Sequence, residues 1–203
     1  YDRANTDKLN LYRQEIDKMD LSLLPPDVNT SDVMFSVKEG KIRYALSAIR
    51  NVGEQAMQEL VDEREKNGSY KDLSDFARRV SGKVLNKRLL ENLILAGAFD
   101  SLHPNRKNIF DQLEEILAYG SQARLQKANA QKSLFGSTAM GVKEIDFIDA
   151  PDWSVSETLQ NEFDALGLYL SAHPVSAYKP LVKGVVSSCD IASYADQTIH
   201  ILG

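Results

Sequence analysis

The sequence contains little cysteine and histidine: one cysteine, Cys189, and three histidines, His103, His173 and His200, in 203 residues. These four side chains are scattered, so they cannot supply the closely spaced ligands of a structural zinc site or an iron–sulfur cluster. A single cysteine also excludes a disulfide-stapled miniprotein. No metal site or other cofactor is therefore expected in this chain.

Long apolar runs are also absent. No stretch approaches the roughly 20 apolar residues that a bilayer span needs, and the first residues lack the basic and apolar regions of a signal peptide. These absences predict a soluble, cytoplasmic protein without a membrane partner. The chain starts at Tyr1 rather than Met, and residues 198–203 alternate like a strand that stops without a partner. We therefore expect a segment of a longer protein.

The composition, 43% hydrophobic and 26% charged, is that of one mid-sized domain, or of a small domain with pieces of its neighbours. The net charge of −5 is unevenly distributed. Residues 38–110 contain 14 Lys/Arg and 10 Asp/Glu, a balance of +4, against −9 for the rest of the chain. This split predicts one basic binding module among acidic neighbours, although a solvated mixed-charge surface gives similar totals.

The periodicity predicts a mainly α fold. Alternating apolar residues indicate a β-hairpin between Val33 and Tyr44. Helical spacing then predicts helices at 46–49, 56–66, 73–80, 85–94 and 109–117, followed by a polar loop from about 126 to 151. The capping box Ser154–Glu157 begins one more helix, and a truncated β segment ends the chain.

Asn51-Val52-Gly53 lies between two predicted amphipathic helices and fits the turn of a helix-hairpin-helix motif. Asn or Gly can take the positive φ of such a turn, Val52 would plug the helix pair, and the amides of the next helix would face a phosphate. A β-branched residue at Gly53 is expected to strain the turn and block that phosphate. An ordinary αα-hairpin with a glycine cap is the alternative.

A second helix-turn-helix unit follows about 45 residues later, with a degenerate turn around Gly97. Two such units can straddle the strands of a duplex, which favours DNA binding over two plain hairpins. The basic residues at or near the turns are candidates to neutralise phosphates: Arg50, Lys83, Lys87, Arg88, Arg106 and Lys107.

Leu134 and Phe135 stand as an adjacent apolar pair in the otherwise polar segment Gln131-Lys132-Ser133-Leu134-Phe135. An exposed pair of this kind is stable only when it docks, either on its own domain or in a pocket of a partner. The sequence has no Asp-x-Asp pair for two metal ions and no Gly-rich phosphate loop, so we expect no catalytic residues in this chain.

Five motifs in one order resemble the alpha subunits of bacterial DNA polymerase III, the replicative (family C) polymerase, over nearly the whole chain. They are residues 24–29, 42–46 with 51–54, 86–88 with 96–100, 131–135 and 166–174. The resemblance implies the end of the fingers region (1–32), a tandem helix-hairpin-helix duplex-binding domain (33–125), a loop with a clamp-binding motif (126–153), a helical connector (154–184) and the start of an OB domain (185–203).

The same resemblance implies the partners and the sites. Asn51, Val52 and Gly53 match the first DNA-binding hairpin, with Asn51 in place of the usual first glycine. Gln131, Ser133, Leu134 and Phe135 match the motif that docks on the beta sliding clamp. Duplex DNA, that clamp and the remainder of the polymerase III holoenzyme are the implied partners. The catalytic carboxylates of this DNA-directed DNA polymerase, and their Mg²⁺, are expected in a palm domain outside this chain.

Three rival interpretations stay open. A helix-hairpin-helix glycosylase or nuclease would need a catalytic Asp or Lys in a pocket, and often a cysteine cluster. The error-prone paralogue of the same polymerase shares the hairpins but usually has a weaker clamp motif. A protein-interaction module would not touch DNA.

Overall fold

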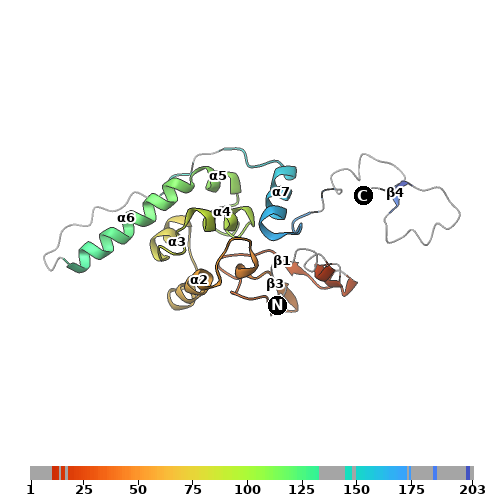
Figure 1. The fold of residues 1–203 in the computed structure, drawn as a ribbon, viewed down its shortest axis with the longest axis horizontal. Coiled ribbons are helices and arrows are strands. Elements are labelled where there is room, and N and C mark those ends of the chain that lie inside the picture. Colours follow the sequence, from red (N-terminus) through yellow and green to blue (C-terminus); the bar gives the residue numbers. More distant parts are fainter. Residues whose placement is uncertain are drawn as a thin grey trace.

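A computed structural model describes residues 11–13, 15–16, 18–132, 145–147, 150–172, 174, 185–186 and 200–201, with backbone only at 129–132, 185–186 and 200–201. Helices dominate it, as the sequence predicts, and a small sheet lies beside them (Figure 1). No helix in the described part is long and apolar enough to cross a membrane.

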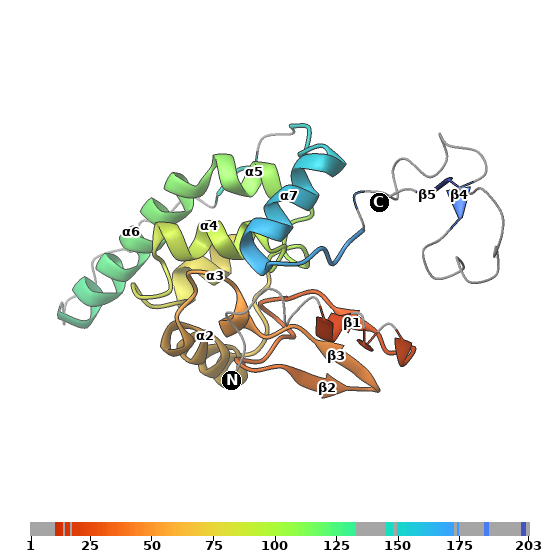
Figure 2. The ribbon, with the colours of Figure 1, turned by 45° about the vertical axis from the view of Figure 1, so that its right-hand side comes forward.

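The sheet has three short strands, β1 (Leu23–Leu24), β2 (Ser36–Lys38) and β3 (Lys41–Arg43), in the order β1-β3-β2. The predicted hairpin is confirmed as the antiparallel pair β2–β3, in which Val37 lies opposite Ile42. Its two turn residues, Glu39 and Gly40, have φ of 53° and 74°, as a tight two-residue hairpin requires. The parallel strand β1 was not predicted; the sheet lies beside α2 (Glu54–Asn67) (Figure 2).

The remaining helices are η1 (Leu46–Ala48), a single 3-10 turn, and α3 (Leu73–Arg79), α4 (Lys87–Leu95), α5 (Arg106–Asp111), α6 (Leu113–Lys132) and α7 (Val155–Leu166). Polar side chains begin four of them by accepting an amide hydrogen bond three residues ahead: Asp72, Asn86, Asn105 and Ser154. Ser154 and Glu157 form the predicted capping box, which fixes where α7 begins.

Apolar side chains from α2 to α6 meet in one core, to which α7 adds Ala165 and Leu166. Phe76 lies at its centre, fully buried, with ring centroids 4.9 Å from Phe99 and 5.1 Å from Tyr70 in edge-on geometry. This packing holds both helix-turn-helix units in one body.

Three of the predicted elements, two helices and one loop, need correction. The first predicted helix is only the η1 turn, because Ala45 and Ile49 on either side have extended backbones. The helix predicted at 109–117 is divided at Gln112, between α5 and α6. The loop predicted from about 126 is still helical to Lys132, across the boundary placed at 125/126.

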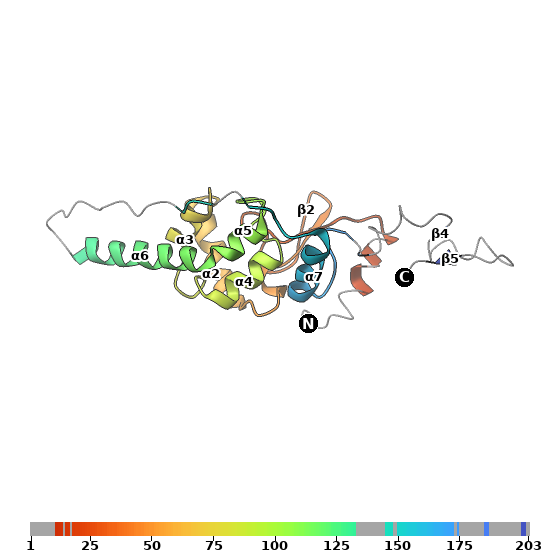
Figure 3. The ribbon, with the colours of Figure 1, turned by 90° about the horizontal axis from the view of Figure 1, so that it is seen from above.

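Helix α6 passes very close to α3 at Gly120. A Cβ atom at this position would lie 2.6 Å from the carbonyl oxygen of Ala77 and would also collide with Leu85. Glycine therefore permits the two backbones to approach, and beyond this crossing the C-terminal part of α6 projects past the other helices (Figure 3).

Residues 145–147 and 150–153 lie against the helical body. The Ile145 amide donates to Ser74 Oγ at 3.1 Å, the Phe147 ring lies 4.4 Å from His103, and Trp153 meets Phe110 edge-on at 5.6 Å. Ser133, Leu134 and Phe135 of the predicted clamp motif lie outside the described residues, as does the side chain of Gln131.

Near the end of the chain, β4 (Val185–Val186) pairs in parallel with β5 (His200–Ile201). The expectation that the last strand has no partner is therefore wrong.

Candidate nucleic-acid interface

The first predicted turn, between η1 and α2, has the backbone of a tight hairpin. Asn51 takes a left-handed conformation with φ of 59°, as expected for an Asn in this position. Val52 is buried and packs the turn against the core. Gly53 differs from expectation: its φ of −78° is ordinary for any residue, and a Cβ there would have no neighbour within 4 Å. A side chain at Gly53 would therefore not strain the turn.

Gly53 is the N-cap of α2, a helix of 14 residues. Because glycine has no side chain, this cap supplies no acceptor for the first amides of the helix. The helix dipole makes the same end partly positive. The first turn therefore presents the N-terminus of a long helix at an exposed glycine, an arrangement that suits an anion.

Arg88 of α4 reaches this turn from the second helix-turn-helix unit. Its Nη2 donates to Asn51 Oδ1 at 2.6 Å, and its side chain is exposed. No carboxylate among the described residues pairs with Arg88. Asn92, one turn further along α4, donates to the Arg88 carbonyl at 2.7 Å and accepts from Asn51 Nδ2 at 3.4 Å. Asn92 was not predicted from the sequence as a site residue.

Arg50 donates hydrogen bonds to carbonyls at the C-terminus of α7. Its amide donates to the Ala165 carbonyl at 2.9 Å, and its guanidinium donates to the Asp164 carbonyl at 3.0 Å. A cation is favourable where helix carbonyls are left over. Tyr44 Oη donates to the next carbonyl, that of Leu166, at 3.2 Å, and burial raises the Tyr44 pKa so that this donor keeps its proton. The first turn and α7 are thus fastened together.

The three candidate lysines are exposed or half-buried, and each contacts a carboxylate. The pairs are Lys83–Glu59 at 2.6 Å, Lys87–Glu114 at 2.5 Å and Lys107–Asp111 at 2.6 Å. The hydrogen bonds to Glu114 and Asp111 raise the pKa of Lys87 and of Lys107. Pairs at such surfaces are weak, so each lysine can exchange its partner for a phosphate.

The second turn is closed by a buried charge network. Gly97 has φ of 76°, and the Arg106 guanidinium occupies the place where a side chain on Gly97 would lie. Arg106 forms two hydrogen bonds with Asp100, at 2.6 and 2.8 Å, and one with Glu162 of α7 at 3.2 Å. Arg106 is only 8% exposed, so it supports the turn from inside instead of lying on the surface as predicted.

The amides that begin α5 also have partners. Asn105 Oδ1 accepts from Asn108, and Asp152 Oδ1 accepts from Lys107 at 3.0 Å. The two turns therefore differ. At the second turn the Asp152 carboxylate accepts an amide at the helix start, whereas at the first turn the N-cap Gly53 supplies no side-chain acceptor and the carboxylate in the first turn of α2 belongs to Glu54.

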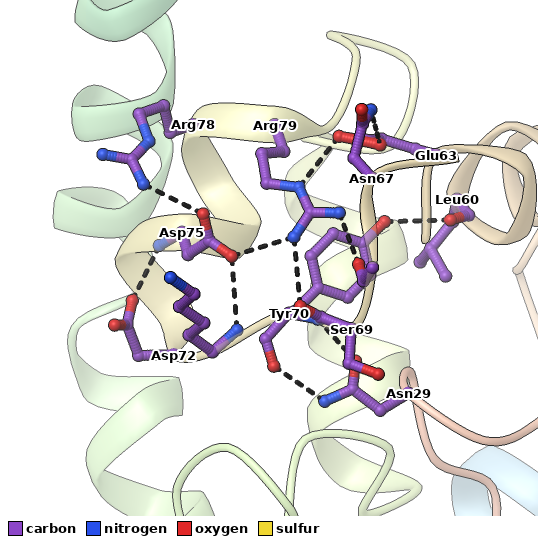
Figure 4. Close-up of polar contacts among 12 residues, drawn as sticks. Asn29, Leu60, Glu63, Asn67, Ser69, Tyr70, Asp72, Asp75, Arg78 and Arg79 are labelled. Atoms are coloured by element: carbon purple, nitrogen blue, oxygen red, sulfur yellow. Dashed lines mark hydrogen bonds and ion pairs between the residues drawn. The ribbon is translucent and has the colours of Figure 1, made fainter. Parts of the chain in front are cut away.

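A second network, not predicted from the sequence, orders the connection from α2 to α3 (Figure 4). Arg79 donates to Glu63 and Asp75, each at 2.9 Å, and to the carbonyls of Gly68 and Ser69. Its guanidinium lies 4.6 Å from the Tyr70 ring centroid. This network fixes the far end of α2 relative to the core. In sequence, Arg79 is one basic residue among many, so nothing distinguished it.

Among the described residues, no group of three or more His, Cys, Asp or Glu side chains could hold a metal ion.

The fold and the first turn define a helix-hairpin-helix protein, and residues 20–109 match the family model described as a helix-hairpin-helix motif. Over 205 residues the chain is 36% identical to DNA polymerase III subunit alpha of Borreliella burgdorferi, covering 98% of this chain and 18% of that protein. It is 40% identical over 177 residues to the subunit of the same name from Pasteurella multocida, covering 86% and 15%. The chain belongs to the DNA polymerase III alpha subunit family, and it spans less than a fifth of the length of these relatives.

Proposed function

We propose that this chain binds double-stranded DNA through the phosphate backbone, without sequence preference, as part of a replicative DNA polymerase. The observation that carries the proposal is the N-terminus of α2 at Gly53, which has no side-chain acceptor of its own and lies beside Arg88 across Asn51. A phosphate oxygen at this position would accept hydrogen bonds from backbone amides and would face the positive end of the helix dipole. Such contacts do not distinguish bases.

A salt titration tests the proposal directly. The 203-residue chain should bind a labelled duplex weakly. Its affinity should fall steeply with salt concentration, because each phosphate that a Lys or Arg neutralises releases a counterion from the DNA, and this release is less favourable at high salt. With about four phosphates neutralised, the log–log slope should lie near −3 to −4. A slope near zero, or no binding at about 50 mM salt, would contradict the duplex-binding role.

Gly53→Asp separates binding from folding. An Asp at the N-cap accepts from the first amides of α2, so the free energy of unfolding should stay within a few tenths of a kcal/mol of the parent or rise. The new carboxylate would take the place of the phosphate at the α2 amides and repel it, so duplex affinity should fall at least tenfold. Ser69→Asp, beyond the other end of α2, is the matched control for the added charge and should bind nearly as the parent does. Equal losses in both variants would show that only net charge matters.

We further propose that the polymerase chemistry resides in other parts of the longer polypeptide, with Mg²⁺ held by carboxylates there. The names of the relatives support the polymerase assignment, and the described residues of this chain offer no competing metal site. The domain limits, from the end of the fingers region at 1–32 to the start of the OB domain at 185–203, are proposed on the sequence resemblance.

We also propose that Gln131, Ser133, Leu134 and Phe135 dock on a ring-shaped sliding clamp. The support is the sequence pattern, a Gln followed by two adjacent large apolar residues in a polar segment. Docking would bury Leu134 and Phe135 in a pocket of the partner, and the ring would keep the polymerase near the duplex.

A further inference from the structure

We propose that Asn51 is a positioning residue, which holds the Arg88 guanidinium beside the first turn so that one phosphate meets both Arg88 and the α2 amides. This inference rests on the proposed duplex binding and adds a role for a side chain that the usual glycine of the motif does not have.

Three side chains form a closed set of contacts at the turn. Arg88 Nη2 donates to Asn51 Oδ1 at 2.6 Å, Asn51 Nδ2 donates to Asn92 Oδ1 at 3.4 Å, and Asn92 Nδ2 donates to the Arg88 carbonyl at 2.7 Å. The set joins the turn of the first helix-turn-helix unit to the first helix of the second. Asn51 lies two residues before Gly53, the N-cap of α2, so its bond with Arg88 brings the guanidinium to the turn that precedes this helix.

The chemistry of the partner explains why an amide suits this place. A carboxamide accepts one of the five N–H groups of Arg88 and leaves the positive charge uncompensated. Lys83, Lys87 and Lys107, by contrast, each contact a carboxylate that a phosphate would have to displace. The φ of 59° admits few residues, chiefly Gly, Asn and Asp, and of these only Asn offers a neutral acceptor.

Holding Arg88 before DNA arrives reduces the cost of binding. A free arginine side chain loses much rotamer freedom when it is fixed on a phosphate, and an already ordered guanidinium loses less. Asn51 therefore acts on affinity through Arg88, without a contact of its own to the DNA.

The experiment is a mutant cycle on duplex binding, with a labelled duplex titrated in salt. Arg88→Ala should reduce the steepness of the log–log salt slope by about 0.9, the value for one phosphate. Asn51→Gly keeps the left-handed backbone and should weaken binding three- to tenfold. In the Arg88→Ala background the same change should have no further effect. Asn51→Asp should resemble Arg88→Ala, because the new carboxylate pairs with the guanidinium.

Lys66→Ala is the matched control, since it removes an exposed cation from the last turn of α2, far from Gly53. It should leave the slope nearly unchanged, and thermal melting should report an intact fold in every variant. The inference is overturned if Asn51→Gly binds like the parent, or if its loss is the same with and without Arg88.

A readout without DNA distinguishes this inference from the proposed function. The NMR order parameter of the Arg88 Nε–H bond should be high in the parent chain and should fall in Asn51→Gly. A mobile Arg88 in the parent overturns the inference whether or not DNA binds. An ordered Arg88 in a chain that binds no duplex would refute the proposed function, and with it the phosphate role of this contact.

Discussion

Arg79 shows how one buried side chain determines the course of the backbone around it. It is only 14% exposed, and it bonds two carboxylates from different helices and two carbonyls of the loop between them. Burial raises the pKa of Asp75, but hydrogen bonds from Arg78, Arg79 and the Lys71 amide outweigh it, and the pKa of this carboxyl lies below its ordinary value. The ionised form of Asp75 therefore stabilises the fold.

Arg79→Ala should lower the free energy of unfolding by about 3 kcal/mol or more in urea denaturation, because Glu63 and Asp75 lose a buried partner. A carboxyl with a lowered pKa stabilises above its unfolded pKa, and the effect disappears as the pH falls through the folded pKa. The loss should therefore be greatest near pH 7 and shrink below about pH 4.

Arg78→Ala is the matched control. Arg78 bonds the same Asp75 carboxylate at 2.9 Å, but its side chain is 59% exposed, so its removal should lower stability by less than about 1 kcal/mol. Equal losses in Arg78→Ala and Arg79→Ala would contradict the role assigned to the buried network.

Residue roles at the candidate site were only partly predictable. Asn51 and Val52 behave as their types suggest, since Asn tolerates positive φ and a buried apolar residue plugs the turn. Arg50 and Arg106 look like surface cations in the sequence, yet Arg50 binds the end of α7 and Arg106 is buried against Gly97. Arg50 contacts Asp164, 114 positions away in the sequence, and Arg106 contacts Glu162, 56 positions away. A local sequence pattern reveals neither contact.

At the scale of elements, the sequence predicts helices well where an apolar stripe marks them, as in α2, α3, α4 and α7. Helix α6 shows where this signal fails. Its second half is polar and projects beyond the core, so no stripe is needed, and the segment was expected to be a loop. Its division from α5 at Gln112 was not predicted either, because the apolar spacing continues across this residue.

Gly120→Ala tests the close crossing of α3 and α6, because the crossing decides whether this substitution raises or lowers the free energy of unfolding. In an exposed helix, this change raises stability by about 1 kcal/mol. At Gly120 the new methyl would meet the Ala77 carbonyl, which belongs to the backbone and cannot move alone, so we expect a loss of about 1–3 kcal/mol in urea denaturation. Ser121→Ala, at the exposed neighbour, is the control and should be nearly neutral. A gain in Gly120→Ala would contradict the close crossing.

At the scale of the whole molecule, DNA and clamp binding are proposed for separate parts of the chain. The first turn lies in the packed body, whereas Gln131 and Lys132 form the projecting end of α6, and Leu134 and Phe135 come shortly after it in the sequence. The described residues on either side are fixed independently: α6 crosses α3 at Gly120, and Ile145 bonds Ser74. Changes to Leu134 and Phe135 should therefore affect partner binding without affecting the core.

Leu134→Ala together with Phe135→Ala should abolish measurable binding to a sliding clamp, because it removes two apolar anchors of about 2 kcal/mol or more each from an interaction of about micromolar affinity. The helical backbone at Gln131 and Lys132 must unwind if the motif docks in extended form, which keeps single-site affinity modest. Surface plasmon resonance on the immobilised clamp measures this loss, while melting temperature and duplex affinity should stay those of the parent. Leu125→Ala, an exposed apolar residue earlier on α6, is the matched control and should bind the clamp normally. Lost stability with clamp binding intact would instead show that Leu134 and Phe135 belong to the chain's own core.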